Sequence, residues 1–154
     1  MNMRKVSLIT AVAVLGLTFV VPAGASVAPT TIAIPRIGVT AAIGTRLDRG
    51  PIFWPRVGRP GQGTTVAIAA HDVTPVPGFH GHGPFHDIND LRNGDRIYLS
   101  RAGERHPYRV TGQKLVLATN LHIADLTRYE RVLLTTCWPR GSSKYRLVVY
   151  ARPA

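Results

Sequence analysis

Cys137 is the only thiol in the sequence, and it ends an apolar run, residues 132–137. A free thiol has a pKa of about 8.5, so thiolate chemistry requires a base or a cation nearby. His71 ends an earlier apolar run, residues 64–70, where a rigid strand meets an open loop. Arg146 follows Cys137 by nine positions, across a turn. These residue types predict a nucleophile, a proton carrier, and a guanidinium that stabilises a thiolate or binds an oxyanion.

The two apolar runs explain how these side chains meet. Both read as buried strands, and His71 and Cys137 each stand at a strand end. If the strands are neighbours in one sheet, both side chains reach one site. A hairpin to the next strand, residues 145–150, brings Arg146 back beside Cys137. On position alone, Arg146 as an exposed strand residue and Cys137 as a small buried hydrophobe remain open alternatives.

Short strands separated by turns continue along the chain and predict an all-β barrel or sandwich. The further strands are expected at residues 32–34, 36–39, 96–100, 108–111 and 114–117. Loops are expected at 48–63 and 72–84, one helical turn within 85–91, and a short helix at 120–129 with Asn120 as a candidate cap. No βαβ rhythm and no internal repeat appear.

The N-terminus has the order of a secretory signal peptide. Arg4 and Lys5 precede an apolar run, residues 6–21, and small residues follow at 22–26. We expect residues 1–25 to be either a cleaved signal peptide or a retained signal-anchor helix, and residues 26–31 to be a linker. Outside the cytosol, a cysteine without a partner in its own chain indicates an intermolecular bridge or a reactive thiol.

Basic residues dominate the charge of the chain. The net charge is +11, of which Arg4 and Lys5 contribute two, leaving +9 beyond the N-terminal segment. Such a balance favours anionic partners such as acidic lipid or anionic wall polymers. The basic residues are scattered, and no helix-turn-helix, zinc-finger or RNA-binding signature is present, so no nucleic-acid partner is predicted.

Three histidines, His80, His82 and His86, lie close together in a loop. Neighbouring histidines can bind a metal, but neither an HExxH nor a CxxC spacing is present. We therefore read this segment as a polar loop and expect no metal and no cofactor.

Several segments together resemble the sortases, the cysteine transpeptidases of Gram-positive cell envelopes. They are Ala69-Ala70-His71, Gly83-Pro84-Phe85, Leu91-Arg92-Asn93-Gly94-Asp95, Leu134-Thr135-Thr136-Cys137 and Arg146. The resemblance runs from about residue 32 to residue 152 and makes residues 32–154 the sortase catalytic domain. The short spacing from Cys137 to Arg146, with Trp138-Pro139 after the thiol, is most similar to class E or class D sortases of actinobacteria. Leu133 departs from the threonine common in the family.

The resemblance implies a closed sortase-type β-barrel with one or two short helices, in which His71, Cys137 and Arg146 are catalytic. It implies a weaker role for Thr136, in shaping the oxyanion site. The implied substrates are surface proteins with a C-terminal signal of the Leu-Pro-x-Thr-Gly type, or Leu-Ala-x-Thr-Gly for class E, cut between Thr and Gly. The implied acceptor is an amine of a peptidoglycan precursor or of another surface protein, and water can hydrolyse the thioacyl intermediate.

The implied location is the cell envelope: either the extracellular face of the membrane, with the membrane as a partner of a retained N-terminal helix, or the secreted state. An L,D-transpeptidase is disfavoured because its thiol usually sits in a Ser-x-Gly-Cys context. A papain-like peptidase is disfavoured because it places Cys before His. The non-enzymatic alternative is an exported basic module that binds anionic wall polymers, with Cys137 merely buried.

Overall fold

The computed structural model describes residues 28–154, so the expected signal or anchor helix lies outside the described residues. The strands are β1 (Thr31–Ile34), β2 (Val39–Ala42), β3 (Ile52–Phe53), β4 (Thr65–Ala69), β5 (Arg96–Arg101), β6 (Glu104–Leu117), β7 (Arg131–Trp138) and β8 (Tyr145–Pro153). The 3-10 turns are η1 (Pro35–Ile37), η2 (Leu47–Arg49), η3 (Ile88–Asp90) and η4 (Leu121–Ala124). Within residues 28–154, no helix is long and apolar enough to cross a membrane.

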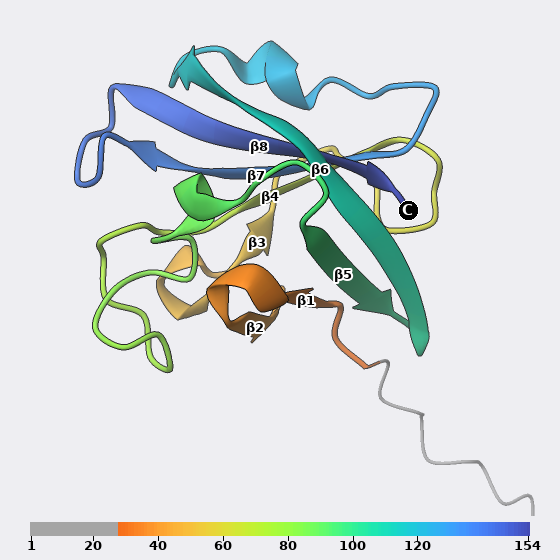
Figure 1. Ribbon diagram of the computed structural model, residues 1–154, viewed down its shortest axis with the longest axis horizontal. Helices are drawn as coiled ribbons and strands as arrows, with labels where there is room; N and C mark the ends of the chain where they lie inside the picture. The colour runs from red at the N-terminus through yellow and green to blue at the C-terminus, as the bar shows by residue number, and fades with distance from the viewer. Residues whose placement is uncertain (1–27) are drawn as a thin grey trace, which may run out of the picture.

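All eight strands belong to one sheet, in the order β2-β1-β5-β6-β8-β7-β4-β3. The sheet curls on itself, with the long β6 crossing the molecule diagonally (Figure 1). Its edge strands, β2 and β3, have four and two residues, and between them the described chain forms one isolated bridge, from Gly44 to Ile52. The closed barrel expected from the sequence is therefore a curled half-barrel, because its edge strands are too short to form a continuous ladder.

Strands β4 and β7 lie at the centre of the packing and are buried on both faces. Residues 65–68 and 132–136 are consecutively buried, which is the pattern of strands covered from two sides. The inner face packs into the main core with Phe85 and Ile88. The opposite face, called here the outer face, carries a smaller cluster that includes Leu133 and Val148 and packs against Ile123 of η4. A functional site on these strands is therefore expected at their C-terminal ends, where residues such as Cys137 are no longer fully buried.

The structure corrects several boundaries. Residues 108–111 and 114–117 form one strand, β6, with an irregular register between Val110 and Gly112 where two strands were expected. Strand β3 lies in the expected loop 48–63. The helical turn expected within 85–91 is confirmed as η3, whereas the short helix expected at 120–129 is only the turn η4, and Asn120 makes no side-chain capping hydrogen bond. Segments this short do not repay the cost of nucleating an α-helix.

Glu130, just before β7, fastens a distant loop to the sheet. Its carboxylate accepts hydrogen bonds from the backbone N–H groups of Gly61 (3.1 Å) and Gly63 (2.7 Å) and from the hydroxyl of buried Tyr108. Partial burial raises the pKa of Glu130, but the bonds from Tyr108, Gly63 and Gly61 outweigh it and hold that pKa below its ordinary value.

Replacing Glu130 with glutamine is expected to lower the free energy of unfolding by about 1–3 kcal/mol at neutral pH, because a charged acceptor makes stronger hydrogen bonds. A carboxyl with a depressed folded pKa stabilises the fold above its unfolded pKa and loses that contribution as the pH falls through the folded value. The difference between wild type and Glu130→Gln, measured by urea denaturation, should therefore disappear at low pH. A pH-independent difference would contradict this assignment, and the exposed Glu104→Gln is the matched control.

Candidate active site

Cys137 and Arg146 lie directly opposite each other in the hairpin of β7 and β8. The Nη1 of Arg146 donates a hydrogen bond to the Sγ of the partly buried Cys137 at 3.5 Å. The same nitrogen is held by the carbonyl oxygens of Ser143 (3.3 Å) and Tyr145 (3.2 Å). The hairpin expected from the spacing is confirmed, and it places a fixed cation on the only thiol.

His71 follows β4, the strand that pairs with β7 in parallel, and so lies at the same end of the strands as Cys137. Ala69 is paired with Thr135, and the N–H of Ala70 donates to the carbonyl oxygen of Thr135 at 3.2 Å. His71 and Cys137 each lie two residues beyond that pair. Because neighbouring strands are about 4.8 Å apart, this pairing places the backbone of His71, just after β4, at the same end of the sheet as Cys137, near the end of β7. The strand pairing thus places the three residues singled out from the sequence at one end of the sheet.

Thr136 lies next to the thiol, but its side chain points away from it. Alternation along β7 puts Thr136 on the face opposite Cys137, where it is buried. Its hydroxyl donates to the carbonyl oxygen of Ala70 at 2.8 Å and so fastens the end of β4 to β7. An oxyanion role for Thr136 stays a prediction, which this engaged hydroxyl does not itself support.

Gly83 fixes the backbone of His71 by close approach. A Cβ at position 83 would lie 2.1 Å from the carbonyl oxygen of His71 and 2.3 Å from its carbonyl carbon, so only glycine fits. The N–H of Phe85 donates to that oxygen at 3.0 Å, and the N–H of Gly83 donates to the carbonyl oxygen of Asp72 at 2.7 Å. The Gly-Pro-Phe segment therefore has a physical role: it holds the histidine in place after β4 has ended.

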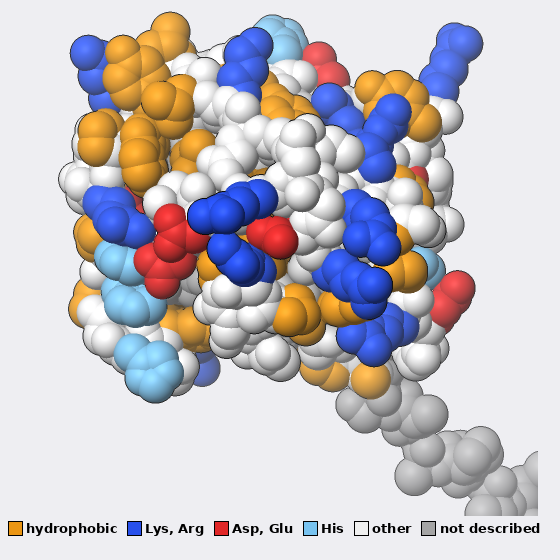
Figure 2. Space-filling view, in the orientation of Figure 1, with side chains coloured by type: hydrophobic (Ala, Val, Ile, Leu, Met, Phe, Trp, Pro, Cys, Tyr) orange, Lys and Arg blue, Asp and Glu red, His pale blue; other side chains and the backbone are white. Residues whose placement is uncertain are grey.

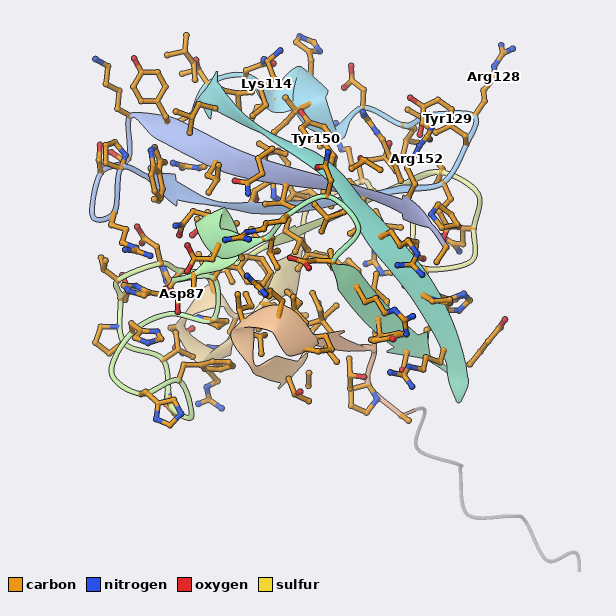
Figure 3. All side chains as sticks on the ribbon, in the orientation of Figure 1. Asp87, Lys114, Arg128, Tyr129, Tyr150 and Arg152 are labelled. Atoms are coloured by element: carbon orange, nitrogen blue, oxygen red, sulfur yellow. The ribbon has the colours of Figure 1, made fainter. Side chains whose placement is uncertain are left out.

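Two contacts join the loop after His71 to the turn between β7 and β8. The buried carboxylate of Asp72 accepts a hydrogen bond from the N–H of Gly141 at 3.0 Å. Arg140 donates to the carbonyl oxygen of His86 at 3.0 Å and to the carboxylate of Asp87 at 3.1 Å; Asp87 is labelled in Figure 3. Neither Asp72 nor Arg140 was singled out from the sequence. Their partners are more than 50 positions away, which no local pattern reveals.

Asp72 is expected to act as a positioning residue. Asp72→Ala should lower kcat/KM by about ten- to a hundredfold, mainly through kcat, since small displacements of catalytic groups have effects of that size. Asp72→Asn keeps an oxygen that accepts from Gly141 and should retain most activity. Steady-state kinetics on a sorting-signal peptide would check this, with the exposed Asp48→Ala as control. Equal losses in both Asp72 variants would instead assign the effect to its charge.

The histidine loop is held by hydrogen bonds and stacking. The rings of His82 and His86 stack with centroids 4.2 Å apart, and the Nδ1 of His86 lies 3.1 Å from the carbonyl oxygen of Asp72. In residues 28–154, no three His, Cys, Asp or Glu side chains gather in a group suited to a metal ion. His82 and His86 thus help to shape the loop that follows His71.

A groove of about 610 Å³ opens on the outer face, which also carries Cys137. It is lined by Trp54, Pro55, Arg56, Leu121, Ala124, Asp125 and Leu126. The indole N–H of Trp54 donates to the hydroxyl of Thr135 at 3.0 Å, and Thr135 lies two residues before Cys137 on the same face of β7. Neither this groove nor a larger hollow of about 930 Å³ between η1 and η3 is lined by a residue of β7 or β8, but only the groove has a lining residue, Trp54, with a hydrogen bond to β7 among those described. The groove beside Trp54 is therefore the better candidate for a peptide that must reach the thiol.

A thiol, a histidine and a guanidinium at one edge of a curled all-β sheet form a candidate site for thiol-dependent acyl transfer. The model of the sortase domain family matches residues 32–154. The chain therefore belongs to the sortase family, a family of cysteine transpeptidases. The resemblance found in the sequence is confirmed at the level of the family.

Solved structures agree with this assignment. A lid mutant of sortase A from Corynebacterium diphtheriae is similar with a TM-score of 0.72 and 26% identity, over 86% of this chain and 74% of that one. Sortase C of Clostridium perfringens, solved with the C-terminal cell wall sorting motif, is similar with a TM-score of 0.70 and 27% identity, over 80% and 69%. The sortase D5 transpeptidase of Clostridium perfringens shares the fold, with a TM-score of 0.70 at 22% identity over 82% and 78%. The similar structures thus span sortases A, C and D and do not single out a class. A comparison with curated proteins found no significant match.

Proposed function

We propose that this chain is a transpeptidase that cleaves a C-terminal sorting signal of the Leu-Pro-x-Thr-Gly or Leu-Ala-x-Thr-Gly type between Thr and Gly. The observation that carries the proposal is the pairing of Cys137 with Arg146, whose guanidinium lies 3.5 Å from the thiol sulfur. The solved sortase C that contains a cell wall sorting motif supports a substrate of this kind.

In the first half-reaction, the Cys137 thiolate attacks the carbonyl carbon of the substrate Thr, and negative charge develops on the carbonyl oxygen. Arg146 holds the substrate and donates hydrogen bonds to this oxyanion. Collapse of the intermediate breaks the Thr–Gly C–N bond, and His71 gives a proton to the leaving amine of Gly. The product is a thioacyl bond between the substrate Thr and Cys137.

In the second half-reaction, an incoming amine attacks the thioacyl carbon. His71 accepts the proton that the amine loses, a new amide bond forms, and the C–S bond breaks to regenerate the Cys137 thiolate. The acceptor is an amine of a peptidoglycan precursor or of another surface protein. Water in place of the amine hydrolyses the thioacyl intermediate.

The groove beside Trp54 is where the sorting signal binds in this proposal. It lies on the face of the sheet that carries Cys137, and its lining combines apolar side chains with Arg56 and Asp125. Apolar walls with a few polar groups are typical of sites that bind and orient a short peptide. The apolar first residue of the signal packs there, and the Thr carbonyl then reaches the thiol.

The location follows from the same proposal. Residues 1–25 are a signal peptide or a signal-anchor, residues 26–31 a linker, and residues 32–154 the catalytic domain. The enzyme acts at the extracellular face of the membrane or, once cleaved, in the cell envelope. Both places contain the sorting-signal proteins and the acceptor amines that the reaction needs.

The test is incubation of the full-length chain with a library of sorting-signal peptides, followed by mass spectrometry of the intact protein. The expected result is an adduct on Cys137 whose mass ends at the substrate Thr, and whose amount falls when an amine acceptor is added. Peptide cleavage without an adduct on Cys137, or an adduct on another residue, would overturn the proposal. The preferred library member also distinguishes Pro from Ala at the second position.

A further inference from the structure

A row of three arginines crosses three neighbouring strands on the outer face. Arg96 of β5 is paired with Arg109 of β6, and Arg109 is paired in turn with Arg152 of β8. All three are exposed. Side chains directly opposite each other in adjacent strands have Cβ atoms about 5 Å apart, and like charges there destabilise the sheet.

Within residues 28–154, none of the three arginines lies within salt-bridge distance of a carboxylate. Their hydrogen bonds in this part of the chain go to neutral oxygens only: the Tyr98 hydroxyl and the carbonyl oxygens of Gly94 and Glu130. Three cations at cross-strand distance therefore repel one another, at a cost in stability. An anion from outside would remove that cost, which makes the row a candidate interaction surface.

Further cations and aromatic rings extend the row. The guanidinium of Arg105 lies 3.7 Å from the ring centroid of Tyr98, and Arg96 donates to the Tyr98 hydroxyl at 3.2 Å. That hydrogen bond, followed by the charges of Arg96, Arg105 and Arg109, lowers the pKa of Tyr98, so these cations share one small area. Figure 2 shows Lys and Arg side chains in a column that descends toward the point where the chain enters the described region.

At the other end of the row, Arg152 lies over the ring of Tyr129 at 4.0 Å. Both residues line a groove of about 380 Å³ together with Lys114 and Tyr150, and Figure 3 shows these four side chains beside β6 and β8. Tyr129 is exposed and Tyr150 partly exposed, and tyrosines that reach the surface next to cations are typical of surfaces that meet the headgroup layer of a membrane.

Strand β5 connects the row to the beginning of the described chain. Thr31, the first residue of β1, is paired with Ser100, which is paired with Arg105 and lies four residues along β5 from Arg96. The expected signal or anchor segment ends at residue 25, and a six-residue linker, 26–31, spans at most about 20 Å. If that segment is retained in the membrane, the Thr31 end of the sheet is held within this distance of the lipid surface, and Arg96 lies about 13 Å farther along β5.

We propose that the row formed by Arg96, Arg109 and Arg152 is a docking surface for the anionic phospholipid headgroups of the membrane. Lipid is favoured over a wall polymer because the row lies about 13 Å, measured along β5, from the point where the predicted anchor segment joins the domain. Arg146 precedes Arg152 by six residues on β8, which corresponds to about 20 Å along the strand. When the row is docked on the membrane, the site at Cys137 and Arg146 therefore lies about 20 Å from the row.

The experiment uses the full-length chain in which Thr111→Cys, beside the row, carries a fluorophore and Cys137→Ser leaves that label unique. Energy transfer is measured to headgroup-labelled lipid in vesicles of phosphatidylcholine alone or mixed with phosphatidylglycerol. We expect stronger transfer with the anionic vesicles at low salt and loss of the difference at high salt. Arg96→Gln, Arg109→Gln and Arg152→Gln combined should reduce transfer on anionic vesicles to the neutral level, since each arginine near an anionic surface contributes about fivefold in affinity.

The matched control removes three positive charges elsewhere, as Arg49→Gln, Arg56→Gln and Lys144→Gln, and should keep the preference for anionic vesicles. The three Arg→Lys replacements in the row should keep most of it as well. Equal transfer on both vesicle types, or an equal loss in the control, would overturn the proposal. If the triple Gln variant fails to fold, the salt dependence of the unsubstituted row is the test: a preference for anionic vesicles that persists unchanged at high salt would overturn the proposal. A response to added inorganic polyphosphate but not to anionic vesicles would overturn lipid in favour of a soluble polyanion.

Discussion

The full-length chain with Cys137→Ala is expected to release no product from a sorting-signal peptide, with a loss of kcat/KM of at least about a thousandfold. The physical reason is that the covalent route disappears: no other thiol exists in the sequence to form the thioacyl intermediate. Turnover of a fluorogenic Leu-Pro-x-Thr-Gly peptide and of its Leu-Ala counterpart would measure the effect.

The control for this experiment is Ser143→Ala, in the turn between β7 and β8. Ser143 contributes only its backbone carbonyl oxygen to the position of Arg146, so this variant should keep nearly full activity. Thermal unfolding of both variants would show that the fold is intact. Turnover near the wild-type rate in Cys137→Ala would refute the mechanism, whereas a loss in both variants would indicate a disturbed turn.

Arg146→Lys is the second large effect, with an expected loss of about 10²–10³ in kcat/KM, the size found when one oxyanion donor is removed. An ammonium is a single point charge. It cannot contact the Cys137 sulfur, remain anchored on the carbonyl oxygens of the turn, and also point donors at a substrate oxygen, as a planar guanidinium can. The loss should appear in kcat as well as in KM, because the oxyanion exists only in the transition state and the intermediate.

Arg49→Lys, an exposed arginine remote from β7 and β8, is the matched control and should leave the kinetics unchanged. A normal kcat in Arg146→Lys would remove Arg146 from the site. A change confined to KM would restrict its role to holding the substrate. His71→Ala should also abolish turnover, and its loss should not add to that of Cys137→Ala, since the two residues act in the same steps.

The candidate site residues could be proposed from the sequence because each one stands near the beginning or the end of a strongly patterned strand. The apolar runs before His71 and Cys137 specify buried strands, and the short spacing from Cys137 to Arg146 specifies a hairpin. What the pattern left open was whether the first two strands are neighbours. Their parallel pairing depends on how the whole sheet curls, and only the family resemblance implied it.

The supporting residues could not be found in the same way. Asp72 and Arg140 look like ordinary loop residues, and their partners become neighbours only after the sheet has formed. The contact of Trp54 with Thr135 spans 81 positions. The helix expected at 120–129 was too long because local propensity does not record the tertiary hydrogen bonds of the loop before β7, such as those that Glu130 accepts from Gly61 and Gly63. Contacts of this kind depend on tertiary packing, which periodicity does not encode.

The parallel pairing of β4 with β7 has a consequence for the order in which the enzyme becomes active. The bond from Thr136 to Ala70 closes a span of 66 residues, and long-range parallel pairing is slow because the entropy of the intervening chain must be lost first. The hairpin of Cys137 and Arg146 is local and can form early, whereas His71 joins only when that span closes. We therefore expect folding to pass through a stage in which Arg146 already faces Cys137 while His71 is still apart, so that the proposed site is completed late, together with the sheet.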